Sequence, residues 1–274
     1  MKLGLNAMET AGALMVLSLA MVALFAPELA PHDPVRAVAA TFGDPGAPSR
    51  AFPLGTDQLG RDVLSRIIYG ARISLTVGVA AMAVTMTIGV TIGLAAGFFG
   101  GAVDSILMRF TDVMLTLPAL LLAMAFVAVL QPGLWSILIV IGLVSWTQIA
   151  RVVRAEALSL TQRDFVVAAR ALGAPPARLI ARHVMPNAMP LIVVMAVLGT
   201  SGTLLLDAGL SFLGLGVPPP TPSWGRMIEE ATTYFRTAPW LAIYPGLAIF
   251  YAVLGFNLLG YGFIRRRGHS ADFQ

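Results

Sequence analysis

The sequence predicts an all-α polytopic membrane protein with six transmembrane helices, and three observations support this prediction. Of the 274 residues, 57% are hydrophobic and 12% are charged, whereas a typical soluble domain has about 25% charged residues. The mean hydropathy is +0.82. Several stretches are free of charge for about 20 residues or more, which is the length that an α-helix needs to cross a bilayer.

The first predicted span covers residues 10–27, TAGALMVLSLAMVALFAP, between two glutamates. A cleaved signal peptide also has an apolar core, but here the apolar part is long and Lys2 is the only basic residue before it. We therefore expect a retained transmembrane helix.

The second predicted span lies within residues 73–103, a stretch without charge. It contains three glycines at intervals of four residues: Gly89, Gly93 and Gly97. This spacing places all three on one face of a helix, where the absence of side chains lets another helix approach closely. We expect these glycines to serve helix packing.

Four further spans complete the predicted count. Residues 113–150 carry no charge and are interrupted only by QPG at 131–133, which predicts two spans joined by a tight turn. The fifth span is predicted over residues 184–206 and the sixth over residues 237–264.

The basic residues predict the orientation, because Lys and Arg near the ends of spans resist translocation. More of them lie on the side of both termini than on the opposite side, and Arg265, Arg266 and Arg267 follow the last span directly. We therefore expect both termini to be cytoplasmic. The predicted division is a cytoplasmic tip with the first span (1–30), an external loop (31–72), a five-helix core (73–267) and a cytoplasmic tail (268–274).

The external loop begins with Pro- and Asp-rich segments that favour turns, and then becomes regular in PLGTDQLGRDVLSRIIYGARISL. Thr56 is a candidate N-cap of a helix there. The apolar residues of that helix would lie on one face: Leu59, Val63, Ile67 and Ile68. This pattern suits an amphipathic helix on the outer membrane surface that docks an external partner, and a solvated linker is the alternative.

Asp207, in LLLDAGLSFLGLG, is the acidic residue predicted to lie near or inside the bilayer boundary. A buried carboxylate in lipid is costly and usually marks a polar pathway or a partner. The alternative is that Asp207 sits at the interface and caps a short segment that begins at Ala208. In the external loop that follows, Trp224 is placed to act as an interfacial anchor.

The loop over residues 151–186 is strongly basic. Two short helices are predicted in it, one through DFVVAARAL and one through PARLIARHV, separated by residues 173–176. Ala168, Ala169 and Gly173 leave part of the surface without side chains, so that another protein can approach the backbone closely. We expect Phe165, Leu172 and Leu179 to fill a pocket of that partner while four arginines meet an acidic rim; these are Arg163, Arg170, Arg178 and Arg182. An amphipathic loop on anionic lipid is the alternative.

Composition excludes several kinds of site. The only lysine is Lys2, so a phosphate-binding loop of the form G-x-x-x-x-G-K-[ST] does not occur. There is no cysteine, and the three histidines are far apart in the sequence, so we expect no metal site. Because the chain is rich in apolar residues, we attribute its basic residues to its place in a membrane, and we do not expect nucleic-acid binding.

The segment AARALGAPPARLIARHVMPN resembles the cytoplasmic-loop signature of permease subunits of binding-protein-dependent ABC importers. The matching positions are Ala168, Ala169, Gly173 and Pro186, and Val167 stands where the family often has glutamate. The stretches PLGTDQLGRDVLSRIIYGARISL and DAGLSFLGLGVPPPTPSWG are similar to the second permease subunit of the dipeptide/oligopeptide/nickel group, in which glutamate is common at the position of Asp207.

This resemblance implies a permease subunit in a bacterial inner membrane that is not itself an enzyme. Its implied partners are a second, similar permease, two cytoplasmic ATPase subunits that hold ATP and Mg²⁺, and an external substrate-binding protein. The 163–186 loop would couple ATPase closure to the spans. Peptides are the expected substrate, with nickel, glutathione or another small solute as alternatives.

Two functions of other classes are alternatives. A secondary transporter driven by an ion gradient would be expected to carry intramembrane charges and an inverted repeat, whereas the predicted spans are nearly free of charge and the sequence shows no internal repeat. An intramembrane enzyme would need a nucleophile and a base, or paired carboxylates, at membrane depth; only Asp207 is a candidate, and no catalytic residue is predicted.

Overall fold

The computed structural model describes residues 7–39, 43–130 and 133–271, with only the backbone described for residues 266–271. Regular structure in these ranges is helical, apart from one isolated antiparallel bridge between Thr56 and Asp62, which confirms the predicted all-α class. The elements are α1 (Ala7–Leu24), α2 (Ala26–Leu29), α3 (Val63–Phe99), α4 (Gly101–Thr116), α5 (Ala119–Val129), α6 (Leu134–Thr161), α7 (Asp164–Ala171), α8 (Pro176–Leu179), the π-helical turn η1 (Ile180–Val184), α9 (Met185–Phe212), α10 (Trp224–Ala231), the 3₁₀ turn η2 (Thr232–Tyr234) and α11 (Trp240–Ala271).

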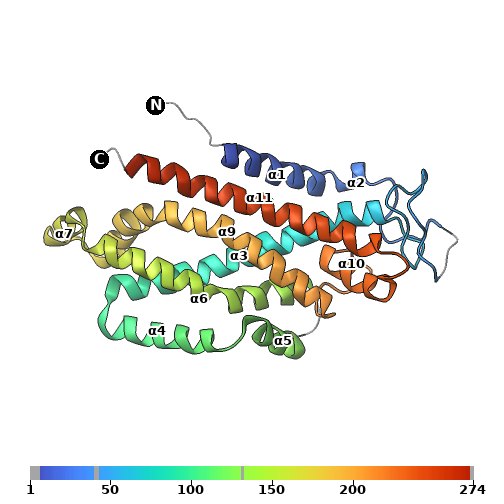
Figure 1. Ribbon diagram of the computed structural model, residues 1–274. Coiled ribbons are helices and arrows are strands. Elements are labelled where there is room, and N and C mark those ends of the chain that lie inside the picture. Colours follow the sequence, from blue (N-terminus) through green and yellow to red (C-terminus); the bar gives the residue numbers. More distant parts are fainter. Residues whose placement is uncertain (1–6, 40–42, 131–132, 272–274) are drawn as a thin grey trace.

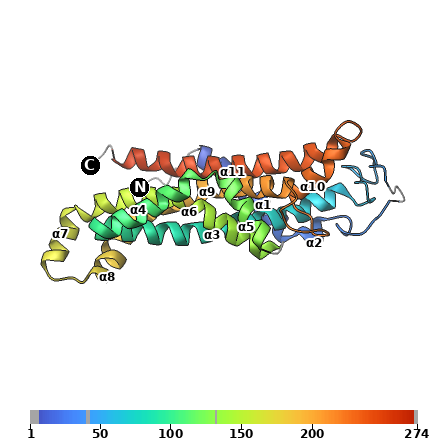
Figure 2. The ribbon, with the colours of Figure 1, turned by 90° about the horizontal axis from the view of Figure 1, so that it is seen from below.

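The long helices α1, α3, α6, α9 and α11 run along one common direction (Figure 1). The start of α1, the end of α11 and the short helix α7 lie at one end of the molecule, and α10 lies with the loop after α2 at the other (Figure 1). Figure 2, turned by 90°, shows α7 and α8 at the same end again. The end of α11 and the predicted coupling loop therefore share one end.

The structure contains five helices long and apolar enough to cross a membrane within its described residues, and up to six crossings if α4 and α5 form one bent span. These two helices meet at an angle of 90°. Leu117 between them has an extended backbone (φ −90°, ψ 129°), and Pro118 has no N–H to continue the helical hydrogen bonds. The third span, predicted from residue 113 to the turn at 131–133, is therefore not one continuous helix, because the bend at 117–118 falls within it. The predicted turn at 131–133 lies partly outside the described residues.

Helix α3 begins ten residues before the predicted second span and runs without a break over 37 residues. Asp62 is its N-cap, and the Asp62 carboxylate accepts a hydrogen bond from the backbone N–H of Ser65 at 2.9 Å. Thr56 instead accepts a hydrogen bond from the backbone N–H of Gly46, so the prediction of a separate surface helix capped by Thr56 is wrong. At 1.5 Å per residue, α3 is about 55 Å long, well beyond the roughly 30 Å of a bilayer core.

The three glycines of the predicted packing face lie against α6. A Cβ atom added at Gly93 would lie 2.6 Å from the carbonyl oxygen of Ala150 and 2.8 Å from Cβ of Val153. Gly89 and Gly97 are equally close to the backbone of α6, at Trp146 and Arg154 respectively. The α3–α6 pair is thus a close backbone contact along several turns, which forms the centre of the bundle.

Candidate functional site

The 163–186 loop forms a helical hairpin at one end of the molecule. Helix α7 follows α6 after two residues, and Val166 anchors it with a fully buried side chain. The helix ends where the backbone N–H of Leu172 donates to the carbonyl of Ala168 and that of Ala174 donates to the carbonyl of Ala169. Gly173 between them has φ +82°, a left-handed conformation that favours glycine.

The second helix of this hairpin is continuous with the membrane helix that follows it. Helix α8 starts at Pro176, the turn η1 widens the helix to π geometry, and α9 continues to Phe212 without interruption. Pro186 lies in the first turn of α9, directly after the π turn, and it has no N–H to donate there. A rotation of α8 is therefore carried directly into α9, and the start of that helix lies well before Pro186.

Most of the residues predicted to contact a partner are exposed in this chain. The exposed members are Arg163, Phe165, Ala168, Arg170, Leu172, Gly173, Arg178, Arg182 and Pro186, and Ala169 is half-buried. Leu172 is 89% exposed, the largest exposed fraction among the apolar side chains of this loop. The prediction for Leu179 is wrong, because its side chain is only 2% exposed and packs inside this chain.

One contact joins the hairpin to the body of the protein, and another joins the two arms of the hairpin to each other. The guanidinium carbon of Arg170 lies 5.8 Å from the ring centroid of Phe98, near the end of α3, which is a cation–π distance. The rings of Phe165 and His183 approach with centroids 6.4 Å apart. Val167 is 50% exposed, so its side chain is free to meet a partner rather than the core.

A cleft of about 590 Å³ lies between α3, α6 and α9 and the α4–α5 bend. Its lining is apolar with a few hydroxyl and amide groups, and none of the lining residues is charged: Met82, Thr85, Met114, Leu115, Leu117, Ala119, Val144, Ser145, Thr147, Gln148, Ile149, Met195, Leu198, Gly199, Gly202, Thr203 and Leu206. Helices α6 and α9 therefore flank the hairpin as well as this cleft.

Asp207 does not line this cleft. It lies inside α9, only 2% exposed, in a narrow space beside Ser74, Trp224 and Ile249. Helix α9 continues past it to Phe212, so the alternative that Asp207 caps a new segment at Ala208 is also wrong. Trp224 is 1% exposed and its indole N–H donates to the carbonyl of Ile67 at 3.1 Å, so this residue is a buried anchor of α10 on α3 rather than an interfacial one.

Sequence reasoning missed two ion pairs between α4 and α6. Arg154 contacts the Asp104 carboxylate through both Nε and Nη2, with Nη2 at 2.5 Å from Oδ2. Arg151 donates to Asp112 at 2.5 Å, with both side chains more than half exposed. No sequence signal joined these residues, because each pair connects two predicted loops, one after the second span and one after the fourth, that are distant in the chain.

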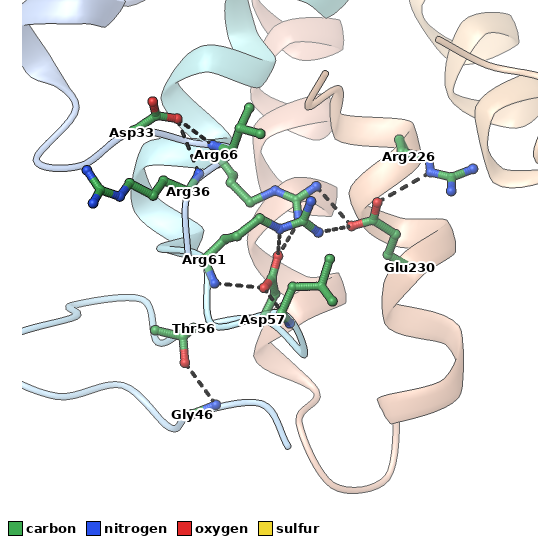
Figure 3. Close-up of polar contacts among 11 residues, drawn as sticks. Asp33, Arg36, Gly46, Thr56, Asp57, Arg61, Arg66, Arg226 and Glu230 are labelled. Atoms are coloured by element: carbon green, nitrogen blue, oxygen red, sulfur yellow. Dashed lines mark hydrogen bonds and ion pairs between the residues drawn. The ribbon is translucent and has the colours of Figure 1, made fainter. Parts of the chain in front are cut away.

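A buried charged cluster at the opposite end was also missed. Asp57, Arg61, Arg66, Arg226 and Glu230 point toward one another from the loop before α3, from α3 and from α10 (Figure 3). Nε of Arg61 lies 2.7 Å from Asp57, and Nη2 of Arg66 lies 2.9 Å from Glu230. These side chains are at most 22% exposed, so the cluster fixes the external loop onto α10.

Comparison with known proteins gives one family and several close relatives. The family described as "Binding-protein-dependent transport system inner membrane component" matches residues 89–267. The chain is 44% identical over 256 residues to the di/tripeptide transport system permease protein DppC of Pseudomonas aeruginosa, over 92% of this chain and 84% of that protein. It is 39% identical over 257 residues to the dipeptide transport system permease protein DppC of Alkalihalophilus pseudofirmus, over 94% and 84% of the two chains. It is 42% identical over 252 residues to the glutathione transport system permease protein GsiD of Pectobacterium atrosepticum, over 92% and 83%.

Proposed function

This chain belongs to the family of inner-membrane components of binding-protein-dependent transport systems, and from this we propose that it carries di- and oligopeptides as one of two permease subunits of an ATP-driven importer. Two relatives with high identity are named as dipeptide or di/tripeptide permeases. A third is named for glutathione, itself a short peptide, which is the second candidate substrate. Nickel remains an alternative from the family resemblance alone.

The coupling part of this proposal rests on one observation. The hairpin is continuous with two helices that form walls of the cleft. Helix α6 leads into α7 after two residues, and α8 runs through η1 into α9. Both α6 and α9 supply lining residues of the central cleft. A helix moves as a rigid body, so displacement of the hairpin by a partner would change the cleft between inward-open and outward-open shapes.

The partner at the hairpin is one of two ATPase subunits, which bind ATP and Mg²⁺. Exposed Ala168 and Gly173 allow close approach to the backbone, and a Cβ added at Gly173 meets no atom of this chain within 4 Å. Leu172 supplies an exposed apolar contact beside them. The exposed arginines at positions 163, 170, 178 and 182 suit an acidic rim around the ATPase cleft.

The second permease completes the path. The segment from α4 to α5 forms one wall of the cleft, and it exposes Phe110, Val113, Leu117 and Leu121. A homologous subunit facing this side would close the cleft into a shared channel. An external binding protein would deliver substrate at the end that holds α10 and the external loop.

The test is transport by the assembled importer in proteoliposomes. The chain is combined with its second permease, both ATPase subunits and the binding protein, and we expect uptake of a labelled dipeptide only when ATP and the binding protein are both present. Competition with glutathione and with Ni²⁺ ranks the alternative substrates. Uptake driven by an ion gradient, by this chain alone and without ATP, would overturn the proposal in favour of a secondary transporter.

A further inference from the structure

The hydrogen-bonding groups of the cleft gather at the middle of the membrane helices. Gln148 is about 20 Å from either end of α6, at 1.5 Å per residue. Ser145 lies three residues before it on the same helix, and both residues line the cleft. Residues three apart on a helix are neighbours on one face, so α6 presents an amide and a hydroxyl together to the cleft.

Gln148 stands out because its polar group is exposed and unused. The residue is exposed, whereas its neighbours Thr147 and Ile149 are buried. Among the described residues, no hydrogen bond or ion pair involves the Gln148 side chain, although Thr203 in the same cleft donates to the backbone carbonyls of Gly78 and Thr200. An exposed amide without a partner in the chain is free to bond a molecule in the cleft, and polar residues kept inside membrane proteins commonly serve function.

The chemistry of a glutamine side chain matches that of a peptide bond. Its carboxamide has an oxygen that accepts and an NH₂ group that donates, so it can bond the N–H and the C=O of another amide. The lining residues of the cleft carry no charge, so they offer no ion pair to a particular charged side chain of a substrate. Recognition of the main chain alone therefore suits a path that passes peptides of varied sequence.

We propose that Gln148, assisted by Ser145, is a substrate-contacting site in the cleft that hydrogen-bonds the peptide-bond amides of a passing di- or oligopeptide. This inference rests on the proposed function. It assigns to the permease itself a recognition of peptide main chain, separate from the selectivity of the binding protein. No step of bond making or breaking is involved.

The experiment compares the wild-type importer with the Gln148→Leu and Gln148→Asn variants in proteoliposomes. Two substrates are used, dialanine and its analogue with an N-methylated peptide bond. For dialanine we expect Gln148→Leu to lower the initial uptake rate about three- to tenfold, the range that follows from losing one net hydrogen bond. Gln148→Asn, which keeps the carboxamide, is expected to retain at least half of the rate.

The N-methylated analogue separates main-chain contact from a merely structural role. It lacks the N–H that Gln148 would accept from, so the ratio of wild-type to Gln148→Leu uptake is expected to fall at least about twofold relative to the ratio for dialanine. Because each ratio compares two importers with the same binding protein and the same substrate, the affinity of the binding protein cancels.

The matched control is Thr91→Val on α3. Thr91 is exposed, does not line the cleft, and its hydroxyl already donates to the carbonyl of Thr87 at 2.6 Å. We expect this variant to transport both peptides like the wild type. Equal uptake by wild type and Gln148→Leu, or an equal loss for both peptides, would overturn the inference. Absence of ATP-dependent peptide uptake in the wild type would instead overturn the proposed function.

Discussion

Arg154 of α6 and Asp104 of α4 form a two-point ion pair in which Nε and Nη2 of the guanidinium face the two carboxylate oxygens. The side chains are 33% and 18% exposed, so the pair is partly shielded from solvent. It lies near the end of α6 that leads into α7, and it joins that end to the helix whose far end lines the cleft. The pair is therefore placed to make α4 follow α6 when the hairpin moves.

The first prediction concerns this pair. Asp104→Asn removes the charge that faces Arg154, and we expect a loss of about 1 to 2 kcal/mol in the free energy of unfolding, because hydrogen bonds to charged groups contribute that much. We also expect a fall in the rate of ATP-dependent uptake that the loss of stability does not explain, because α4 would no longer move together with α6. Thermal unfolding in detergent and uptake in proteoliposomes measure the two effects.

The pair of Arg151 and Asp112 provides the control for this prediction. It joins the same two helices, but its side chains are 52% and 59% exposed. Solvent screens such a pair, so Asp112→Asn is expected to change stability by less than about 1 kcal/mol. Equal effects of the two substitutions on uptake would contradict a special role for Arg154.

The second prediction concerns the contact between α3 and α6. Gly93→Ala would bring a methyl group to 2.6 Å from the carbonyl oxygen of Ala150, so the two helices must separate. We expect a destabilisation of about 1 to 3 kcal/mol, measured by thermal unfolding in detergent. Gly246→Ala in α11 is the control, because a Cβ there meets no atom within 4 Å and alanine is the better helix former. A stable Gly93→Ala variant would mean that α3 and α6 are farther apart.

The third prediction concerns the buried charged cluster of Figure 3. Glu230 faces Arg61, Arg66 and Arg226, so Glu230→Gln leaves the buried guanidinium of Arg66 with less compensating charge. We expect a loss of about 3 to 5 kcal/mol and faster proteolysis of the external loop, because a buried charge is left poorly paired. Glu229→Gln, whose ion pair is with Arg226 alone at 3.4 Å, is expected to cost less than about 1 kcal/mol. Similar proteolysis of the two variants would contradict this account.

The helices and their order could be predicted because charge-free length and hydropathy determine them directly. The bend at Pro118 could not, since proline is tolerated within membrane helices when neighbouring groups satisfy the backbone. Only the extended backbone of Leu117 distinguishes a break from a kink. The third span therefore had the right composition and the wrong shape.

The external segment shows a different limit. Of its predicted apolar face, Val63 and Ile67 pack with Met227 and Leu241 in a protein core rather than on a lipid surface, whereas Leu59 precedes α3 and is 40% exposed. A periodic pattern shows which residues share one face of a helix, but it does not show what that face packs against. For the same reason Leu179 was assigned to an ATPase pocket, although its side chain turns into the chain itself. Glu230, which Arg61 and Arg66 share, is distant from them in sequence, so a single sequence does not pair these residues.

The last prediction separates docking from folding within the hairpin, using two leucines seven residues apart. Leu172 is 89% exposed, so Leu172→Asp is expected to leave thermal stability within about 0.5 kcal/mol. It should nevertheless weaken binding of the ATPase subunits at least about tenfold, because it places a charge in an apolar contact. Leu179 is 2% exposed, so Leu179→Asp is expected to destabilise the permease itself by about 3 kcal/mol or more. Co-purification of the ATPase subunits and thermal unfolding measure both quantities. Both variants introduce the same aspartate side chain, so the added charge alone does not explain a loss of binding in one and a loss of stability in the other. Full ATPase binding by the Leu172→Asp variant would show that the hairpin docks through another face.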